Sequence, residues 1–460
     1  MSRRDLASSE DVPPVAWLSE DKAMAKNANE SISIADIRKD VEEREAHHTD
    51  VLREGLKASL TDLAGFQSWI AQRMEKTGMQ AEQYQVAREE LADQLACQKT
   101  LREDPSALQT GPNAVGKLAG EGVKGGILLF AHADKRPETF EWGRKQPDMI
   151  ERQGRFYGPG IADDVSGITA MLSAVETFRR LGCPQTKDLL VASVLGKQMG
   201  VFGTYGLMTR YGPMDAAIYV HPAESGDGLR EVKMSSLGMT EFLIEIEGKA
   251  PDTTDPHQTI FSKLAVSAAE KGVYLFQGLH EWATQASKRY HHRGLKELAG
   301  QAFALSVGHF TAGTDNLVYE IPLRCVLAGI VCFPPGANLD TVHTEFRETF
   351  ERLVQQDPWL AQSHVCLEWG DHIGESVQSD EQSGFLRMAS QVLTDVTGKE
   401  PSYYYGHSLS DIRYPLLYWN AQAFGVGPLA GDLGKESEWV DRKEYLDTII
   451  AVTEMIRRVV

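Results

Sequence analysis

Apolar runs and alternating stretches divide the chain into regions with different expected folds. The runs at 125–134 (GGILLFAHAD), 188–196 (DLLVASVLG) and 215–223 (DAAIYVHPA) are continuous, short and apolar. Runs of this kind are typical of strands that are buried on both faces of a sheet. The segment 167–182 (GITAMLSAVETFRRLG) has helical spacing and ends at a glycine. The order strand, loop, helix, strand predicts a parallel βαβ arrangement.

The pattern changes after about residue 236. The stretch 239–249 (MTEFLIEIEGK) and part of 321–333 (IPLRCVLAGIVCF) alternate between apolar and polar positions, as strands with one solvated face do. A helical segment, 262–298, lies between them. From about 357 onward, HVCLEWGD, a helix and NAQAFGVGPL restore the α/β pattern. The sequence therefore predicts a large α/β domain that is interrupted by a smaller α+β domain.

The 460 residues exceed one ordinary domain of roughly 100–200 residues, which agrees with this division. Charge-rich stretches with helical spacing lie between 34 and 110. The expected parts are a polar N-terminal segment, the first part of the α/β domain, the inserted domain and the second part of the α/β domain, at 1–33, 34–235, 236–356 and 357–460.

Composition narrows the class of protein. Asp and Glu (65) outnumber Lys and Arg (47), and the net charge of −18 argues against nucleic acid or an anionic membrane as a partner. No apolar run approaches the roughly 20 residues of a membrane span, and the N-terminus lacks the apolar segment of a secretion signal. The five scattered cysteines have no CxxC spacing. We expect a cytoplasmic protein with reduced thiols that acts on a small molecule.

Candidate metal ligands stand at three predicted strand ends and loops. His132 and Asp134 lie in AHAD, Asp163 lies in GPGIADD, and His221 lies in YVHPAE. Open α/β sheets place their sites at the carboxyl ends of strands. Two imidazoles and a carboxylate suit zinc, and Asp134 could fix the orientation of His132. Each motif alone is more often structural, as a satisfied pair or a capped turn, and it is their combination that favours a site.

These motifs also carry a resemblance. LLFAHAD, followed by ERQGRFYGPGIADDVSGITAML, resembles the zinc-dependent amidohydrolases that include acetylornithine deacetylase, succinyl-diaminopimelate desuccinylase, aminoacylase and the carboxypeptidase G type. Weaker similarity continues through IEIEGK, SLSDIRY and FGVGP…ESEWVD, so that most of 110–460 is covered. The resemblance implies a zinc-peptidase-like α/β domain with an inserted lid or dimerisation domain, and a homodimer formed through that lid.

Enzymes of this family hold two metal ions that share one aspartate, and the resemblance transfers half of that site. His132 matches a ligand, Asp134 its supporting aspartate and Asp163 the shared aspartate, while His221 stands where Asp or Glu is usual. The other half does not match. The expected general-base glutamate, ligand glutamate, C-terminal histidine, lid histidine and lid arginine are replaced by Lys197, Gln198, Leu433 or Gly434, Asp252 and Val331.

The resemblance therefore implies one divalent metal, zinc, held by His132, Asp163 and His221. Lys197 either replaces the missing second cation electrostatically or extends to solvent. Possible substitute ligands or substrate contacts are Gln198, Glu224, His407, Asp411, Arg413 and Glu436. Two functions stay open. The first is a divergent hydrolase that cleaves a C–N bond of a small carboxylate-bearing substrate. The second is a catalytically inactive pseudo-hydrolase with a binding, scaffolding or regulatory role.

Overall fold

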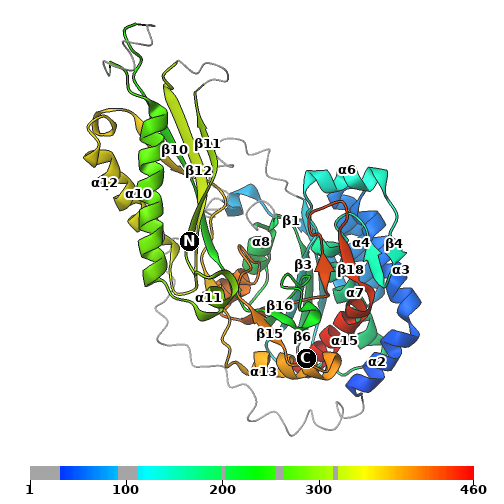
Figure 1. Ribbon diagram of the computed structural model, residues 1–460. Helices are drawn as coiled ribbons and strands as arrows, with labels where there is room; N and C mark the ends of the chain where they lie inside the picture. The colour runs from blue at the N-terminus through cyan, green and yellow to red at the C-terminus, as the bar shows by residue number, and fades with distance from the viewer. Residues whose placement is uncertain (1–31, 92–110, 198–201, 254–263, 314–319) are drawn as a thin grey trace.

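The computed structural model describes residues 32–91, 111–197, 202–253, 264–313 and 320–460, which form a large α/β domain and a smaller α+β domain (Figure 1). The large domain is built on an eight-stranded mixed sheet, and the smaller one on a four-stranded antiparallel sheet. The predicted fold class, an α/β domain interrupted by an α+β domain, is confirmed.

The large sheet has the order β1-β2-β6-β3-β7-β16-β8-β15. Its centre is parallel, because β3 pairs in parallel with both β6 and β7, and β7 pairs in parallel with β16. Strands β1 and β2 extend one edge in antiparallel fashion. The bounds are β1 (Gln80–Gln85), β2 (Pro112–Leu118), β3 (Gly126–His132), β6 (Asp188–Val194), β7 (Ala216–Val220), β8 (Glu231–Lys233), β15 (Ser402–Tyr404) and β16 (Gln422–Val426).

Two apolar cores cover the two faces of this sheet. Along β3, Ile127 and Leu129 face one core while Leu128 and Phe130 face the other. This alternation on a strand that is buried throughout explains its continuous apolar sequence. The larger core contains α2 (Ile34–Glu43), α3 (Glu45–Ser59), α4 (Leu63–Lys76), α7 (Gly167–Arg180), α13 (Gly384–Thr397) and α15 (Arg442–Val459), and the smaller one α8 (Phe202–Arg210) and α14 (Arg413–Tyr418).

The smaller domain packs two long helices against one face of its sheet, whose order is β11-β12-β10-β13. Phe242 and Leu327 from the sheet meet Leu275 and Phe346 from the helices in its core. The elements are β10 (Gly238–Glu247), α10 (Ala268–Arg289), α11 (Arg293–Ala299), β11 (Ala304–Ala312), β12 (Arg324–Phe333), α12 (Leu339–Gln356) and β13 (Val365–Trp369).

Two features of the smaller domain differ from the sequence expectation. Strand β11 was not predicted, because much of it is solvent-exposed and it lacks a clean alternation. Strand β13 forms as expected from HVCLEWGD, but it pairs with β10 of the smaller sheet. The boundary placed at 356/357 therefore falls before the last strand of that sheet.

Shorter elements bring the C-terminal part of the chain beside the acidic loop. Strands β4 (Ile150–Arg152) and β5 (Arg155–Tyr157) precede that loop, and β5 pairs with β18 (Trp439–Asp441), which pairs with β17 (Ala430–Gly431). The remaining elements are α6 (Pro137–Lys145), β9 (Ser235–Ser236), β14 (Val377–Gln378) and the short helical segments η3 (Arg88–Leu91), η5 (Ile161–Ser166), η7 (Gly228–Arg230) and η8 (Leu360–Gln362).

The N-terminal helices are confirmed as α2, α3 and α4, but β1 interrupts the helical pattern expected up to 110, and residues 92–110 lie outside the described residues. The polar segment 1–33 lies almost wholly outside the described residues. Among the helices that the structure describes, none combines the length and apolar composition needed to cross a bilayer.

Candidate metal centre

Three neighbouring parallel strands end at one point of the large sheet, and each supplies a polar side chain. His132 is the last residue of β3, His221 directly follows β7, and Lys197 follows β6. Because β6, β3 and β7 lie side by side in parallel, their carboxyl ends meet at the same edge. Asp163 comes from η5, the loop before α7, and lies opposite these strand ends.

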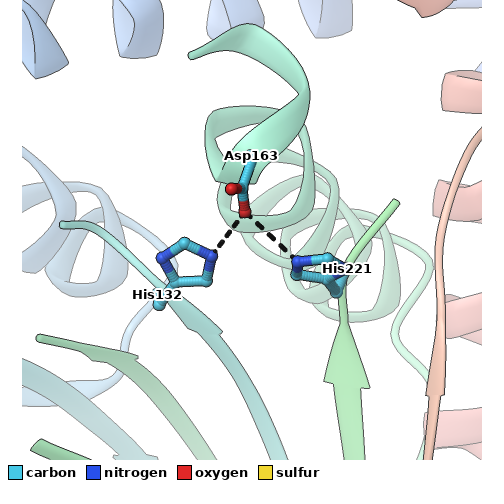
Figure 2. A group of neighbouring side chains, drawn as sticks. All are labelled: His132, Asp163 and His221. Atoms are coloured by element: carbon cyan, nitrogen blue, oxygen red, sulfur yellow. Dashed lines mark hydrogen bonds and ion pairs between the residues drawn. The ribbon is translucent and has the colours of Figure 1, made fainter. Parts of the chain in front are cut away.

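The two imidazoles converge on a single carboxylate oxygen (Figure 2). Asp163 Oδ1 lies 2.7 Å from His132 Nε2 and 3.2 Å from His221 Nε2. Both histidines are buried, and the Asp163 side chain retains 18% of its exposure. We call His132, Asp163 and His221 the HDH group. Its donor atoms all lie within 4.8 Å of one another, as the ligands of one metal ion must.

Lys197 extends into the HDH group. Its Nζ atom lies 2.7 Å from His221 Nε2, 3.3 Å from His132 Nε2 and 3.4 Å from Asp163 Oδ1. The side chain is only 14% exposed. The interpretation that Lys197 extends to solvent is therefore wrong. The interpretation that it supplies a positive charge is supported, but that charge contacts the ligands of the retained metal position.

The charges of these four groups depend on one another. Burial alone would raise the pKa of Asp163, but Lys197 and His132 hold it well below its ordinary value. Burial lowers the pKa of Lys197, yet Asp163, Asp164 and other carboxylates outweigh burial and raise it. Burial and Lys197 together lower the pKa of His221 far below its usual range. The group thus pairs a carboxylate with an ammonium, and His221 is neutral.

Two further carboxylates, those of Asp134 and Asp164, contact His132. Its Nδ1 lies 3.5 Å from Asp134 Oδ1, and its backbone N–H donates to Asp164 Oδ2 at 3.4 Å. Burial and Lys197 lower the pKa of His132, but the charge of Asp163 and hydrogen bonds to Asp134 and Asp163 raise it to about 10. A metal would therefore have to displace the proton of His132. It would also have to displace the Lys197 ammonium from its contacts with the group.

A second group of possible ligands shares His221. His407 Nδ1 lies 2.7 Å from Glu224 Oε1, and His221 Nδ1 lies 3.8 Å from the same oxygen. However, neutral His221 accepts from Lys197 through Nε2, which leaves its proton on Nδ1, 3.2 Å from the Pro222 carbonyl. In that tautomer a metal beside Glu224 and His407 would have to displace the proton on His221 Nδ1.

The other predicted residues fall in different places. Asp411 is fully buried, and burial raises its pKa to about 6 despite the nearby His132 and Lys197. Arg413 is also buried, and its Nη1 has no hydrogen-bond partner within the described chain. Glu436 is exposed, and Gln198 lies outside the described residues.

Sequence reasoning missed two buried residues beside Asp163. Glu438 Oε1 accepts the backbone N–H groups of Ala162 and Asp163, both at 2.7 Å, and thereby holds the acidic loop. Lys135 Nζ donates to the Gly160 carbonyl at 2.9 Å. Lys135 directly follows the motif AHAD, and Glu438 lies inside ESEWVD. Their residue types alone suggested surface positions, so no local signal separated them from exposed neighbours.

The donor set of the HDH group is suited to one metal ion. The HDH group offers two imidazole nitrogens and one carboxylate oxygen, a set that zinc accepts. The family's C-terminal histidine is expected where Leu433 and Gly434 stand, and neither residue has a side chain that can coordinate a metal. Within the described ranges, the two possible ligand groups are the HDH group and the one formed by His221, Glu224 and His407.

The sequence matches a known family over most of its length. The model of peptidase family M20/M25/M40 matches residues 128–459. N-formyl-4-amino-5-aminomethyl-2-methylpyrimidine deformylase of Halalkalibacterium halodurans is 24% identical over 370 residues, which cover 74% of this chain and 81% of that protein. Carboxypeptidase G2 of Pseudomonas sp. is 28% identical over a shorter stretch, 32% of this chain and 35% of that protein.

Solved structures share the fold at low sequence identity. Aminopeptidase PepT of Bacillus cereus has a TM-score of 0.66 at 13% identity and covers 90% of this chain and 98% of its own. Human carnosine dipeptidase 1 has a TM-score of 0.63 at 14% identity, with coverages of 92% and 98%. The resemblance drawn from the sequence motifs and the expectation of a hydrolase are both confirmed by the family match.

Proposed function

Because the chain belongs to peptidase family M20/M25/M40, we propose that it hydrolyses a C–N bond of a small carboxylate-bearing molecule at a centre with a single metal ion. The observation that carries the proposal is the HDH group, in which two buried imidazoles and a carboxylate converge at the carboxyl ends of parallel strands. The deformylase and carboxypeptidase names of its relatives agree with amide-type substrates.

We propose zinc as the metal, with His132, Asp163 and His221 as its ligands. When bound, such a metal polarises a carbonyl oxygen and lowers the pKa of water. Asp134 would orient His132 through Nδ1, and Glu438 would hold the backbone that carries Asp163. These supporting contacts fix the ligand positions whether or not the ligands hold a cation.

Lys197 is not suited to the role of general base, because its raised pKa keeps it charged and without a free lone pair. We propose that His407 receives the proton instead, because burial lowers its pKa and leaves it neutral, whereas contact with His407 and the charge of Lys233 hold the pKa of Glu224 far below its ordinary value. The Glu224 side chain is 26% exposed, so it faces solvent more than Asp163 does, and it contacts His407 Nδ1 at 2.7 Å. Arg413, with its buried and unpartnered Nη1, would bind the substrate carboxylate.

The experiment measures metal content and hydrolysis on the purified protein. N-formyl compounds, N-acyl amino acids and dipeptides form the substrate panel. We expect about one zinc per chain and turnover that falls by at least ~10²-fold in Asp163→Ala. Asp380→Asn, which changes an exposed carboxylate, is the control. Absence of turnover across the panel, with or without added zinc, would contradict the proposal.

The alternative is a pseudo-hydrolase that binds a ligand without cleaving it. One observation favours it: the Lys197 ammonium already contacts all three donors of the HDH group. The pseudo-hydrolase hypothesis predicts that the purified protein has no bound zinc and no turnover, and that an N-acyl amino acid raises its Tm.

We also propose that the protein is a cytoplasmic homodimer that pairs through the smaller domain. Strand β11 stands at the edge of that sheet and exposes Phe310, an apolar surface suited to a second copy. A monomer in sedimentation analysis at micromolar concentration would contradict the dimer.

A further inference from the structure

The position of Lys197 carries an inference about how the HDH group handles metal. The Nζ atom of Lys197 lies within 3.4 Å of three inward-facing atoms, His132 Nε2, Asp163 Oδ1 and His221 Nε2. These are the same three atoms that would ligate a metal. A metal ion bound to them at about 2.0–2.2 Å would lie close to Nζ, and two cations at that distance repel strongly.

We propose that the Lys197 ammonium is an internal competitor for the metal: it occupies the HDH group in the metal-free protein and must move out before zinc can bind. This inference rests on the proposed function, because it assigns the same three residues as metal ligands. It predicts that the HDH group holds one cation at a time, either the ammonium or the metal.

The backbone holds Lys197 where its side chain reaches the group. Its N–H donates to Asp134 Oδ1 at 3.2 Å, so the carboxylate that supports His132 also anchors Lys197. Gly196, with φ +88°, makes the turn after β6 that directs the chain toward this contact. The placement of Nζ therefore follows from the turn and the anchor.

One buried carboxylate, Asp411, is available as a partner for the displaced ammonium. Asp411 is fully buried, and neither of its carboxylate oxygens has a hydrogen-bond partner within the described chain. A buried carboxylate without a partner is costly, and a cation that pairs with it removes that cost. Asp411 is also among the carboxylates whose charge acts on Lys197. We infer that Lys197 moves from Asp163 toward Asp411 when a metal binds.

The alternative relationship is cooperative rather than competitive. A neutral Lys197 could act as a fourth ligand, since a ligand nitrogen would also lie about 3 Å from the other donors. The two relationships predict opposite effects of removing the amine. Without Lys197, metal affinity rises if the ammonium competes and falls if the amine ligates.

The experiment measures zinc affinity by competition with a fluorescent chelator. Wild type, Lys197→Met and Lys197→Gln are compared, and Lys39→Met is the control because that side chain is 74% exposed. We expect both Lys197 variants to bind zinc at least about ten-fold more tightly than wild type, since a repelling charge is removed. Lys39→Met should match wild type. Equal or weaker binding by the Lys197 variants overturns the inference.

The role of Asp411 is tested by a double-mutant cycle. Asp411→Asn should weaken zinc binding several-fold in the wild-type background, because the ammonium loses its alternative partner. The same change should have little effect when Lys197 is already Met. Equal effects in the two backgrounds would contradict the movement toward Asp411.

A variant that is unstable without metal can still be tested, because zinc binding to the folded protein raises its Tm. If Lys197→Met unfolds without metal, Lys197→Gln retains a donor for Asp163, and the zinc-dependent rise in Tm reports affinity for either variant. The Tm of both should rise more than that of wild type at equal zinc.

The two proposals fail in different ways. If wild type binds zinc and hydrolyses a substrate but Lys197→Met gains no affinity, only the competition is contradicted. If wild type binds no zinc and has no turnover while Lys197→Met binds it tightly, the competition stands and the hydrolase proposal gives way to the pseudo-hydrolase.

Discussion

The two sides of Asp163 are built differently. On the strand side, β3 and β7 present His132 and His221 to the carboxylate, and Lys197 contacts all three. On the C-terminal side, Gly434 offers no side chain, and Glu438 uses one carboxylate oxygen on two backbone N–H groups of the acidic loop. One side is arranged around a cation, and the other holds the loop in place.

Buried Lys135 and half-buried Lys197 show how the two sides differ. The pKa of Lys197 is raised, because surrounding carboxylates outweigh burial. Burial dominates at Lys135 and lowers its pKa to about 8, although Glu438 and Asp163 oppose this effect. Lys135 donates to a backbone carbonyl rather than to a ligand atom. Each lysine supplies positive charge next to Asp163, but of the two only Lys197 contacts the three atoms of the HDH group.

The largest effect is expected from a variant that rebuilds the second metal position and so removes the difference between the two sides of Asp163. We expect the triple variant Lys197→Glu, Gln198→Glu and Gly434→His to bind a second zinc and to raise hydrolysis by about 10²-fold, because it restores a base and two ligands. Gly434 has φ +69°, so the histidine costs about 1–2 kcal/mol in backbone strain. Metal stoichiometry by mass spectrometry measures the gain, and one zinc per chain would show that the second position is lost beyond these residues.

Of the predicted substitutions, Lys135→Met should cause the largest loss in the free energy of unfolding. Lys135→Met removes the buried ammonium that donates to the Gly160 carbonyl and whose charge acts on Glu438, and leaving a buried acceptor without its donor costs about 1–3 kcal/mol. Urea unfolding measures the loss. Lys435→Met, at a 70% exposed position, is the matched control and should change stability by less than about 0.5 kcal/mol. A loss below about 1 kcal/mol for Lys135→Met would show that its charge is dispensable.

Glu438 gives the C-terminal side a pH dependence. Burial and Asp163 raise the pKa of Glu438 to about 7, from an ordinary value of 4.5. The folded state then binds more protons than the unfolded state between these values, so this contribution to stability is present below about pH 4.5 and is lost as pH rises toward 7. The shift corresponds to about 3 kcal/mol. Glu438→Gln should flatten the stability profile in this range, and an unchanged slope would contradict the assignment.

Of the four predicted changes, substitution of Arg413 is expected to have the smallest effect. Arg413→Met should raise KM about ten-fold and leave kcat within about three-fold, because a carboxylate contact remote from the reacting bond contributes uniform binding. A substrate that lacks the carboxylate should be insensitive to the change. A fall in kcat without a change in KM would instead place Arg413 at the reacting bond.

The sequence predicted the parts of the site that are local in the chain. The buried runs ending at His132 and His221, with the loop that carries Asp163, were identified because strand ends and loop glycines leave clear patterns. The position of the Lys197 nitrogen was not predictable, because it depends on the adjacency of β6 and β3 and on a turn whose geometry the residues do not specify. Glu438 was missed because its partners, the backbone of Ala162 and Asp163, are about 275 residues away in the chain.

The smaller domain shows the same limit. Strands β10 and β12 were predicted from their alternation of apolar and polar residues. Strand β13 was assigned to the other domain, because its pairing with β10 joins segments that are far apart in the sequence and leaves no local pattern. Long-range pairing is decided by the whole fold, so a boundary drawn from composition alone falls short of the last strand.

The most direct test is a pair of crystal structures of the wild-type protein, one grown with a chelator and one with zinc, with anomalous data collected at the zinc edge. Without zinc, we expect Lys197 Nζ in contact with His132, Asp163 and His221. With zinc, we expect one anomalous peak among these residues and Lys197 turned toward Asp411. Two peaks beside Asp163, or one peak with Lys197 Nζ still among the donors, would contradict the claim that one cation at a time occupies this group.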